Sequence, residues 1–157
     1  FSIGVFKAAL SQSRLNNSLG DIYDHFFKIF LVGPPESGKS SIIRQYCSHE
    51  FTPDHNPTFG MQNHVKNAFG NDLVARLSIW DSPSDERYFH QLQTQAASAD
   101  AILFVYDCND ENSVKSVTEF IKDIAPEAQA GASLFAVANK IDLKSLRHEV
   151  PREILEK

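Results

Sequence analysis

The sequence predicts an α/β domain in which a mostly parallel sheet carries helices on both faces. Short apolar stretches that suit strands alternate with segments whose apolar residues recur every three or four positions, as on a helix. Two of these stretches, 101–106 and 134–138, are almost continuously apolar, which is typical of buried strands in a parallel sheet. A glycine-rich loop separates the first strand from the first helix. In such a fold, ligands bind at the carboxyl ends of the strands.

The composition limits the classes of function. A chain of 157 residues with 42% hydrophobic content can form one domain with its own core. The net charge of -5 argues against a nucleic-acid partner, which would need a basic surface. No apolar stretch is long enough to cross a bilayer, and the first residues lack the pattern of a secretory signal. Cys47 and Cys108 lack metal-ligand spacing, so we expect free thiols in a cytoplasmic protein.

Residues 1–25 are interpreted as an N-terminal extension to a domain that covers 26–157. Ile3, Phe6 and Leu10 keep helical spacing and precede a polar stretch. Two alternatives follow. The favoured one is a loosely ordered extension, and the other is a short amphipathic helix that docks on the domain, on a partner or on a membrane surface.

The first strand and helix, expected at 29–32 and 40–46, enclose a loop with the pattern G-x-x-x-x-G-K-[ST] at 33–40. Backbone N–H groups of this loop and the positive end of the helix dipole point at one spot, which suits a phosphate. Lys39 can reach the outer phosphates, and the Ser40 hydroxyl is placed to bind the Mg²⁺ that bridges them. The carboxylate of Glu36 must point into solvent or weaken binding. The predicted phosphate-binding residues are Gly33, Glu36, Ser37, Gly38, Lys39, Ser40 and Ser41.

A surface loop and a hairpin are predicted next. The segment 51–60 is rich in turn-forming residues. Strands follow at 61–69 and 73–80, with a turn at 70–72 between them. The second strand ends at Asp81. A carboxylate at the end of a core strand beside a phosphate loop is where an outer ligand of Mg²⁺ belongs.

The alternation continues to the end of the chain. Helices are expected within 84–100 and at 113–124, on either side of the buried strand 101–106. The buried strand 134–138 follows the second helix. A further helix is expected at 149–157, with Pro151 in its first turn.

Four motifs, in this order, resemble those of Ras-superfamily small GTPases, and the Rab branch is most similar. They are the loop 33–40, Thr58, the pair Trp80-Asp81, and 139–142, which reads Asn-Lys-Ile-Asp. The resemblance runs from about residue 28 to 157 and implies the three-layer P-loop NTPase (small G-protein) fold. It stops before the last strand and helix of that fold. We therefore expect 26–157 to be a GTPase domain that is C-terminally incomplete.

The resemblance implies GTP or GDP with Mg²⁺ as the ligand. Asp142 would select the base, because its carboxylate can accept the N1–H and the exocyclic amine of guanine, whereas adenine has an acceptor at N1. Phe51 stands where the family has an aromatic residue that packs edge-on against the base. Thr58 stands where a threonine closes on Mg²⁺ and the γ-phosphate. The implied base-binding residues are Phe51, Asn139, Lys140 and Asp142, and the implied metal ligands are Ser40, Thr58 and Asp81.

The sequence departs from the family after Asp81. Family members have Asp-x-Ala-Gly-Gln-Glu where this chain has Asp-Ser-Pro-Ser-Asp-Glu at 81–86. Ser84 replaces the glycine whose N–H meets the γ-phosphate, and Asp85 replaces the glutamine that orients the attacking water. A carboxylate lacks the amide donor and repels developing negative charge. The catalytic residues implied are Lys39, Thr58, Ser84 and Asp85, and we expect slow intrinsic hydrolysis.

Three functions remain open at this point. The first is a Rab-like GTP/GDP switch in membrane trafficking, a monomer that meets effectors and exchange factors and associates peripherally with endomembranes. The second is a nucleotide-bound pseudo-GTPase that serves as a binding module in a larger assembly. The third is an ATPase or kinase, which the Asn-Lys-x-Asp motif disfavours because its aspartate suits guanine.

Overall fold

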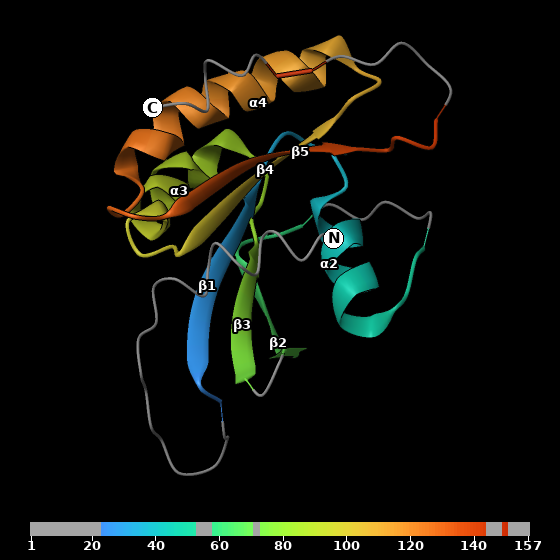
Figure 1. Ribbon diagram of the computed structural model, residues 1–157. Coiled ribbons are helices and arrows are strands. Elements are labelled where there is room, and N and C mark those ends of the chain that lie inside the picture. Colours follow the sequence, from blue (N-terminus) through green and yellow to red (C-terminus); the bar gives the residue numbers. More distant parts are fainter. Residues whose placement is uncertain (1–22, 53–57, 71–72, 144–148, 151–157) are drawn as a thin grey trace.

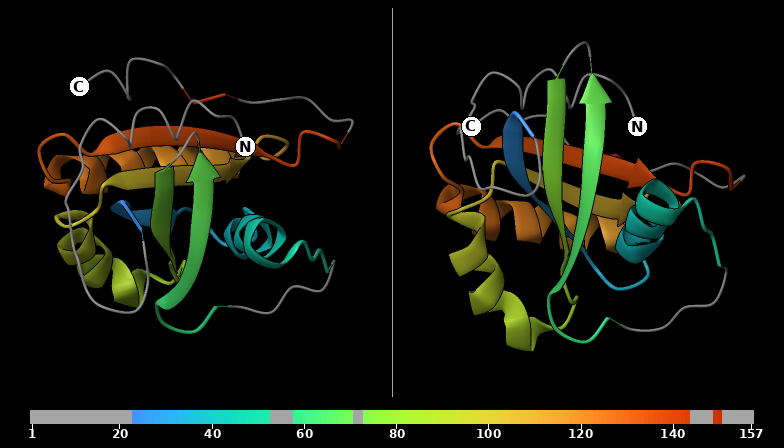
Figure 2. Two further views of the ribbon diagram at one scale, coloured as in Figure 1. Left: turned by 60° about the horizontal axis from the view of Figure 1, so that its bottom comes forward. Right: turned by 90° about the horizontal axis from the view of Figure 1, so that it is seen from below.

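The structure, a computed structural model, describes residues 23–52, 58–70, 73–143 and 149–150. A five-stranded sheet in the order β2-β3-β1-β4-β5 forms the middle layer. Helix α2 covers one face, and α3 and α4 cover the other (Figures 1 and 2). The strands are β1 (His25–Val32), β2 (Gln62–Gly70), β3 (Leu73–Asp81), β4 (Ala101–Asp107) and β5 (Ser133–Asn139). The helices are α2 (Lys39–Ser48), α3 (Phe89–Ala96) and α4 (Glu111–Ile124), with 3₁₀ turns at Glu86–Tyr88 and Ala125–Glu127.

The pairing of the strands confirms the predicted mostly parallel sheet. β1 is central and pairs in parallel with β3 and β4, and β4 pairs in parallel with β5. β2 and β3 form the predicted antiparallel hairpin. Because the four parallel strands point the same way, the segments that follow β1, β3, β4 and β5 meet at one edge of the sheet.

Side-chain alternation along β1 divides the core into two parts. Phe27 and Leu31 pack with Ile43 of α2 on one face. Phe30 and Val32 face the other way and join the cluster that α3 and α4 cover. The helical spacing predicted for α4 is confirmed, since its buried apolar residues are Val114, Val117, Ile121 and Ile124. The helix begins at Asp110, whose side chain accepts the backbone N–H of Asn112.

The strand predicted at 134–138 is present as β5, but the prediction that it is buried is wrong. β4 is buried over six of its seven residues because it has a neighbouring strand on each side. β5 lies at the edge of the described sheet, and its residues are only partly buried apart from the exposed Ala138. Both strands are similarly apolar. Their different burial depends on position in the sheet, which local composition does not record.

Other expectations concern the ends of the chain. The first strand begins at His25, one residue before the predicted domain boundary. The amphipathic helix around Phe6 and the helix proposed for 149–157 lie outside the described residues. Within the described part of the chain, none of the helices has the length and apolar character needed to span a bilayer. Cys47 and Cys108 are both free thiols, as predicted.

Truncation of Phe104 should test the packing around β4. Its ring is fully buried at the centre of the sheet. Phe104→Ala is expected to lower the free energy of unfolding by about 3–5 kcal/mol, because apolar contact is lost and a cavity remains. Urea denaturation measures this. Phe69→Ala is the control, since that ring is 79% exposed and its loss should change stability by no more than about 0.5 kcal/mol. Equal effects of the two variants would contradict the description of the core.

Candidate nucleotide site

The loop between β1 and α2 is held close to neighbouring strands by its two glycines. A Cβ atom at Gly33 would lie 2.1 Å from the carbonyl oxygen of Val105. A Cβ atom at Gly38 would lie 2.2 Å from Nδ2 of Asn139, and the φ angle of Gly38 is 93°, which favours glycine. Gly38 is the residue before the first turn of α2. The loop therefore turns directly into the helix, with backbone N–H groups at the helix N-terminus free for an anion.

Lys39 is buried beneath this loop, and the three N–H groups of its ammonium are all hydrogen-bonded. Only 6% of the residue is exposed. Its Nζ donates to the carbonyl oxygens of Gly33 at 2.8 Å and Pro34 at 3.0 Å, and to Oγ of Ser84 at 2.6 Å. Burial lowers the pKa of Lys39 to about 8, although the nearby Asp81 carboxylate acts in the opposite direction.

The three residues predicted to bind Mg²⁺ are brought together from separate parts of the chain. Oγ of Ser40 donates to Oδ2 of Asp81 at 2.5 Å and lies 3.0 Å from Oγ1 of Thr58. Oγ1 of Thr58 lies 3.4 Å from the same carboxylate oxygen. The other carboxylate oxygen of Asp81, Oδ1, is buried and has no hydrogen-bond partner.

These oxygens fit a magnesium ion that is shared with phosphates. Mg²⁺ takes oxygen ligands and is usually held by one or two carboxylates together with phosphate oxygens. Asp81 is 1% exposed, its Oδ2 lies beside the hydroxyls of Ser40 and Thr58, and its Oδ1 has no partner, so the three side chains form a donor set of this kind. Among the described residues, no group of three or more His, Cys, Asp or Glu side chains could hold a metal on its own.

Two cavities adjoin the phosphate loop and share Glu36, Gly38 and Ser41 in their walls. Their volumes are about 740 and 450 Å³, within the usual range for small-molecule sites. The larger cavity is lined by Phe51 and the motif residues Asn139, Lys140 and Asp142, among others. The smaller cavity is lined by all the predicted catalytic residues, namely Lys39, Thr58, Ser84 and Asp85, and also by Ser40, Arg44 and Arg87.

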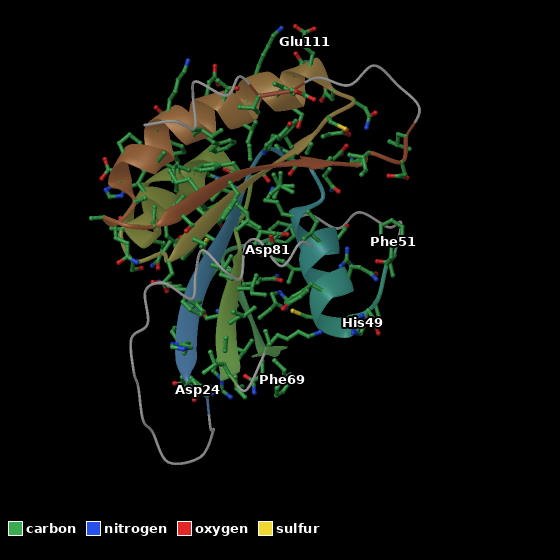
Figure 3. The ribbon with its side chains drawn as sticks, in the orientation of Figure 1. Asp24, His49, Phe51, Phe69, Asp81 and Glu111 are labelled. Atoms are coloured by element: carbon green, nitrogen blue, oxygen red, sulfur yellow. The ribbon has the colours of Figure 1, made fainter. Side chains whose placement is uncertain are left out.

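The predicted base-binding residues therefore line the larger cavity, and the predicted catalytic residues line the smaller one. Asp81 lies between the sheet and α2 (Figure 3) and accepts a hydrogen bond from Ser40, which lines the smaller cavity. Ser37 is fully buried, and its Oγ has no hydrogen-bond partner. Glu36 is exposed, which matches the first of the two alternatives for its carboxylate, and its φ angle is 60°. Phe51 is 71% exposed and lies on the outer side of α2, far from Asp81 (Figure 3).

The Asn-Lys-Ile-Asp motif follows β5 and is tied to the phosphate loop. Nδ2 of Asn139 donates to the carbonyl oxygen of Ser37 at 2.8 Å, so this side chain joins the two loops. Nζ of Lys140 forms an ion pair of 2.9 Å with Asp107 at the end of β4. Burial raises the pKa of Asp107, but hydrogen bonds from Lys140 and Asn109 outweigh it and hold the pKa below its usual value. Asp142 is exposed in the wall of the larger cavity.

Asp85 is engaged by Arg87, a contact that the motifs did not predict. The guanidinium donates from Nε to both carboxylate oxygens at 3.0 Å and from Nη2 to Oδ2 at 2.6 Å. The backbone N–H of Arg87 donates to the same carboxylate, which thereby caps the 3₁₀ turn at Glu86–Tyr88. The hydrogen bonds from the Arg87 side chain, followed by the backbone bond, lower the pKa of Asp85 to about 2. The only sequence signal for this ion pair was that two residues of opposite charge, Asp85 and Arg87, lie two positions apart.

Substitution of Gly33 should test how closely the loop approaches β4. Gly33→Ala is expected to destabilise the protein by about 1–3 kcal/mol, because the new methyl group would overlap the Val105 carbonyl. Urea denaturation without added nucleotide gives the value. The matched control is Gly70→Ala, where a Cβ would have no heavy atom within 4 Å and where stability should hold or rise slightly. A stable Gly33→Ala variant would be inconsistent with this close approach.

Comparison with known proteins agrees with this geometry. The model of the Ras family matches residues 28–156. Human Ras-related protein Rab-30 is 32% identical over 131 residues, which are 83% of this chain and 64% of the relative. Ras-related protein Rab-3 of Caenorhabditis elegans is 31% identical over 125 residues, which are 80% of this chain and 57% of the relative. The chain therefore spans less than two thirds of the length of these relatives. With the Ras-family match over most of its length, the chain belongs to the Ras family and is a Rab-like small GTPase.

Proposed function

We propose that this protein binds a guanine nucleotide with Mg²⁺ and acts as a GTP/GDP switch. The observation that carries the proposal is the convergence of Ser40 and Thr58 on Oδ2 of Asp81 beside the phosphate loop, while Oδ1 of the same carboxylate has no hydrogen-bond partner. The adjoining larger cavity has Asp142 in its wall. One ligand with phosphates and a purine base would account for both cavities.

In this proposal the base occupies the larger cavity. Asp142 accepts two N–H groups of guanine, and Phe51 and the aliphatic part of Lys140 contact its rings. Asn139 acts by positioning the phosphate loop, because its side chain donates to the backbone carbonyl of Ser37 and holds the loop against the end of β5. The ion pair of Lys140 with Asp107 fixes the position of the lysine stem beside the cavity.

The phosphates occupy the smaller cavity. Backbone N–H groups from Glu36 to Ser41 bind them, and Lys39 contributes a buried positive charge. Mg²⁺, when bound, neutralises charge on the phosphates. Ser40 and Thr58 would be its hydroxyl ligands, and Asp81 would hold the Ser40 hydroxyl in place by a hydrogen bond. Because Thr58 belongs to a loop that follows α2, ligand binding at this residue can order the loop and signal the bound state.

Hydrolysis is proposed to be slow. By the family resemblance, Asp85 takes the position of the glutamine that orients the attacking water, but it offers no amide donor, and its charge opposes the charge that develops on the γ-phosphate. Its pairing with Arg87 partly neutralises that charge while holding both oxygens toward the guanidinium. Neither feature supplies the donor that the transition state needs.

The Asp85–Arg87 pair also favours a second candidate function. The Asp85 carboxylate caps a 3₁₀ turn and binds Arg87, two residues later. This is a structural role that does not require it to orient an attacking water. The alternative is a pseudo-GTPase that keeps its nucleotide and serves as a binding module in a larger assembly. Turnover separates this alternative from a switch, because a switch must return to the GDP state.

The cellular setting is proposed from the family alone. By resemblance to Rab proteins, we propose a role in membrane trafficking with effectors and exchange factors as partners. The protein would act as a cytoplasmic monomer that associates peripherally with endomembranes. A partner that binds the GTP form in preference to the GDP form would support the switch over the binding module.

Selective loss of guanine binding tests the proposed base site. Asp142→Ala is expected to weaken GDP and GTP binding by about a hundredfold or more, because two hydrogen bonds to a charged acceptor are lost. Titration calorimetry in the presence of Mg²⁺ measures the affinities. Asp123→Ala, at an exposed position on α4, is the control and should bind as the unchanged protein does. Equal competition by ATP and GTP for the unchanged protein would contradict the proposal and favour an ATP-using enzyme.

Restoring the amide donor tests the account of hydrolysis. The protein should hydrolyse GTP more slowly than about 10⁻⁴ s⁻¹ in single-turnover assays, and Asp85→Gln is expected to raise the rate about tenfold. Asp85→Ala distinguishes the two causes, because it removes the repulsion without adding a donor. Asp123→Gln is the surface control. A rate above this value for the unchanged protein, or no gain from glutamine, would refute this explanation.

A further inference from the structure

We propose that the Ser84 hydroxyl competes with phosphate for Lys39, so that it stabilises the nucleotide-free protein and weakens the binding of GDP and GTP by the same factor. This inference rests on the proposed function and concerns the regulation of the same site. The contact that carries it is the hydrogen bond of 2.6 Å from Nζ of Lys39 to Oγ of Ser84. Ser84 would set how tightly either nucleotide is held, without a preference between them.

The contact occupies the last free donor of the lysine. An ammonium group has three N–H bonds. Those of Lys39 meet the carbonyl oxygens of Gly33 and Pro34 and the hydroxyl of Ser84. A phosphate oxygen that binds Nζ must therefore take the place of one of these three acceptors.

Ser84 is the acceptor that a phosphate would replace. The two carbonyls belong to the phosphate loop itself, which the close approach of Gly33 to Val105 holds in place. Ser84 comes instead from the segment after β3, and it lines the smaller cavity, where the phosphates are proposed to lie. The lysine of a phosphate loop contacts the β-phosphate as well as the γ-phosphate. Because GDP and GTP both carry a β-phosphate, both would displace the Ser84 hydroxyl.

The hydroxyl is held beside the lysine before any ligand arrives. Ser82 is fully buried, and its Oγ donates to the carbonyl oxygen of Leu31 at 2.6 Å. Pro83 is also buried, and its ring restricts the φ angle of the backbone. These two residues anchor the segment that leads to Ser84. The contact with Lys39 therefore belongs to the ligand-free protein and does not need a nucleotide to form.

The contact stabilises the protein only while the phosphate site is free. Lys39 is 6% exposed, so its buried charge depends on hydrogen bonds to protein atoms. Ser84 supplies one of them, and a bound phosphate supplies a stronger acceptor for the same N–H because it is itself charged. The stabilisation from Ser84 is then lost in the complex. Whatever the contact adds to the stability of the free protein is subtracted from the affinity for nucleotide.

The experiment measures affinity and stability in four proteins stripped of nucleotide. They are the unchanged full chain, Ser84→Ala, Ser84→Thr and Ser98→Ala. Titration calorimetry with Mg²⁺ present gives the dissociation constants for GDP and for a non-hydrolysable GTP analogue. Scanning calorimetry gives the melting temperature without nucleotide and with excess GDP.

The variants separate the hydroxyl from other effects of substitution. Ser84→Ala removes the hydroxyl but keeps the backbone N–H, and Ser84→Thr keeps both. Ser98→Ala is the matched control. Oγ of Ser98 also accepts a hydrogen bond from a lysine, Lys28, at 2.7 Å, but Ser98 lines neither of the two cavities.

The expected result is a gain in affinity that matches a loss of stability. In Ser84→Ala, the affinities for GDP and for the GTP analogue should both rise about tenfold, the scale of one hydrogen bond to a charged group. The melting temperature without nucleotide should fall by about 3–6 °C, because a tenfold change is about 1.4 kcal/mol. With excess GDP, Ser84→Ala should melt with the unchanged protein. Ser84→Thr and Ser98→Ala should keep the original affinities.

The results that would overturn the inference are distinguishable. A merely structural role for Ser84 would lower the melting temperature equally with and without GDP and leave both affinities unchanged. A loss of affinity in Ser84→Ala, or a gain for one nucleotide only, would also refute competition while the proposed function stands. If the unchanged protein binds neither nucleotide, the proposed function fails and this inference fails with it. Should Ser84→Ala fold poorly, Ser84→Gly provides the same test, since it also lacks the hydroxyl.

Discussion

The parallel register of the central strands is the constraint on which the rest of the structure depends. Leu31 of β1 pairs with Asp81 of β3, and Val32 pairs with Phe104 of β4. Asp107, at the end of β4, pairs with Asn139 of β5. Since these strands end at the same edge of the sheet, three segments that are far apart in the sequence become neighbours in space. They are the phosphate loop, Asp81 and the motif at 139–142. A shift by one residue would turn each of these side chains to the opposite face.

This arrangement buries charged and polar groups that a ligand would help to satisfy. Lys39 is 6% exposed and Asp81 is 1% exposed, although burial of charge is costly unless it is paired or hydrogen-bonded. Lys39 satisfies its donors with loop carbonyls and a serine. Oδ1 of Asp81 and the hydroxyl of Ser37 are buried and have no hydrogen-bond partner. If the proposed nucleotide and cation supply partners for these atoms, their binding will stabilise the fold.

The segment after β3 connects this buried chemistry to the surface through two neighbouring residues. Ser84 turns inward to Lys39, while Asp85 turns to the exposed Arg87 and caps a 3₁₀ turn. Both positions carry side chains that differ from those expected by resemblance, and both have acquired partners within the protein. The inward contact engages the buried lysine of the phosphate loop, and the outward contact engages an exposed arginine. The two contacts are separate because the side chains point to different partners.

The sequence by itself determined the order and type of the elements, because local periodicity and turn-forming residues predict strands, helices and the hairpin without reference to distant contacts. It also determined the phosphate loop, since its glycines and Lys39 lie within eight consecutive positions, 33–40. Only the tertiary structure decided that β5 lies at the described edge, that Asn139 ties to Ser37, and that Ser84 reaches Lys39. The last two contacts join residues 102 and 45 positions apart. Contacts of that kind depend on how the strands pack, and no local pattern of residues encodes them.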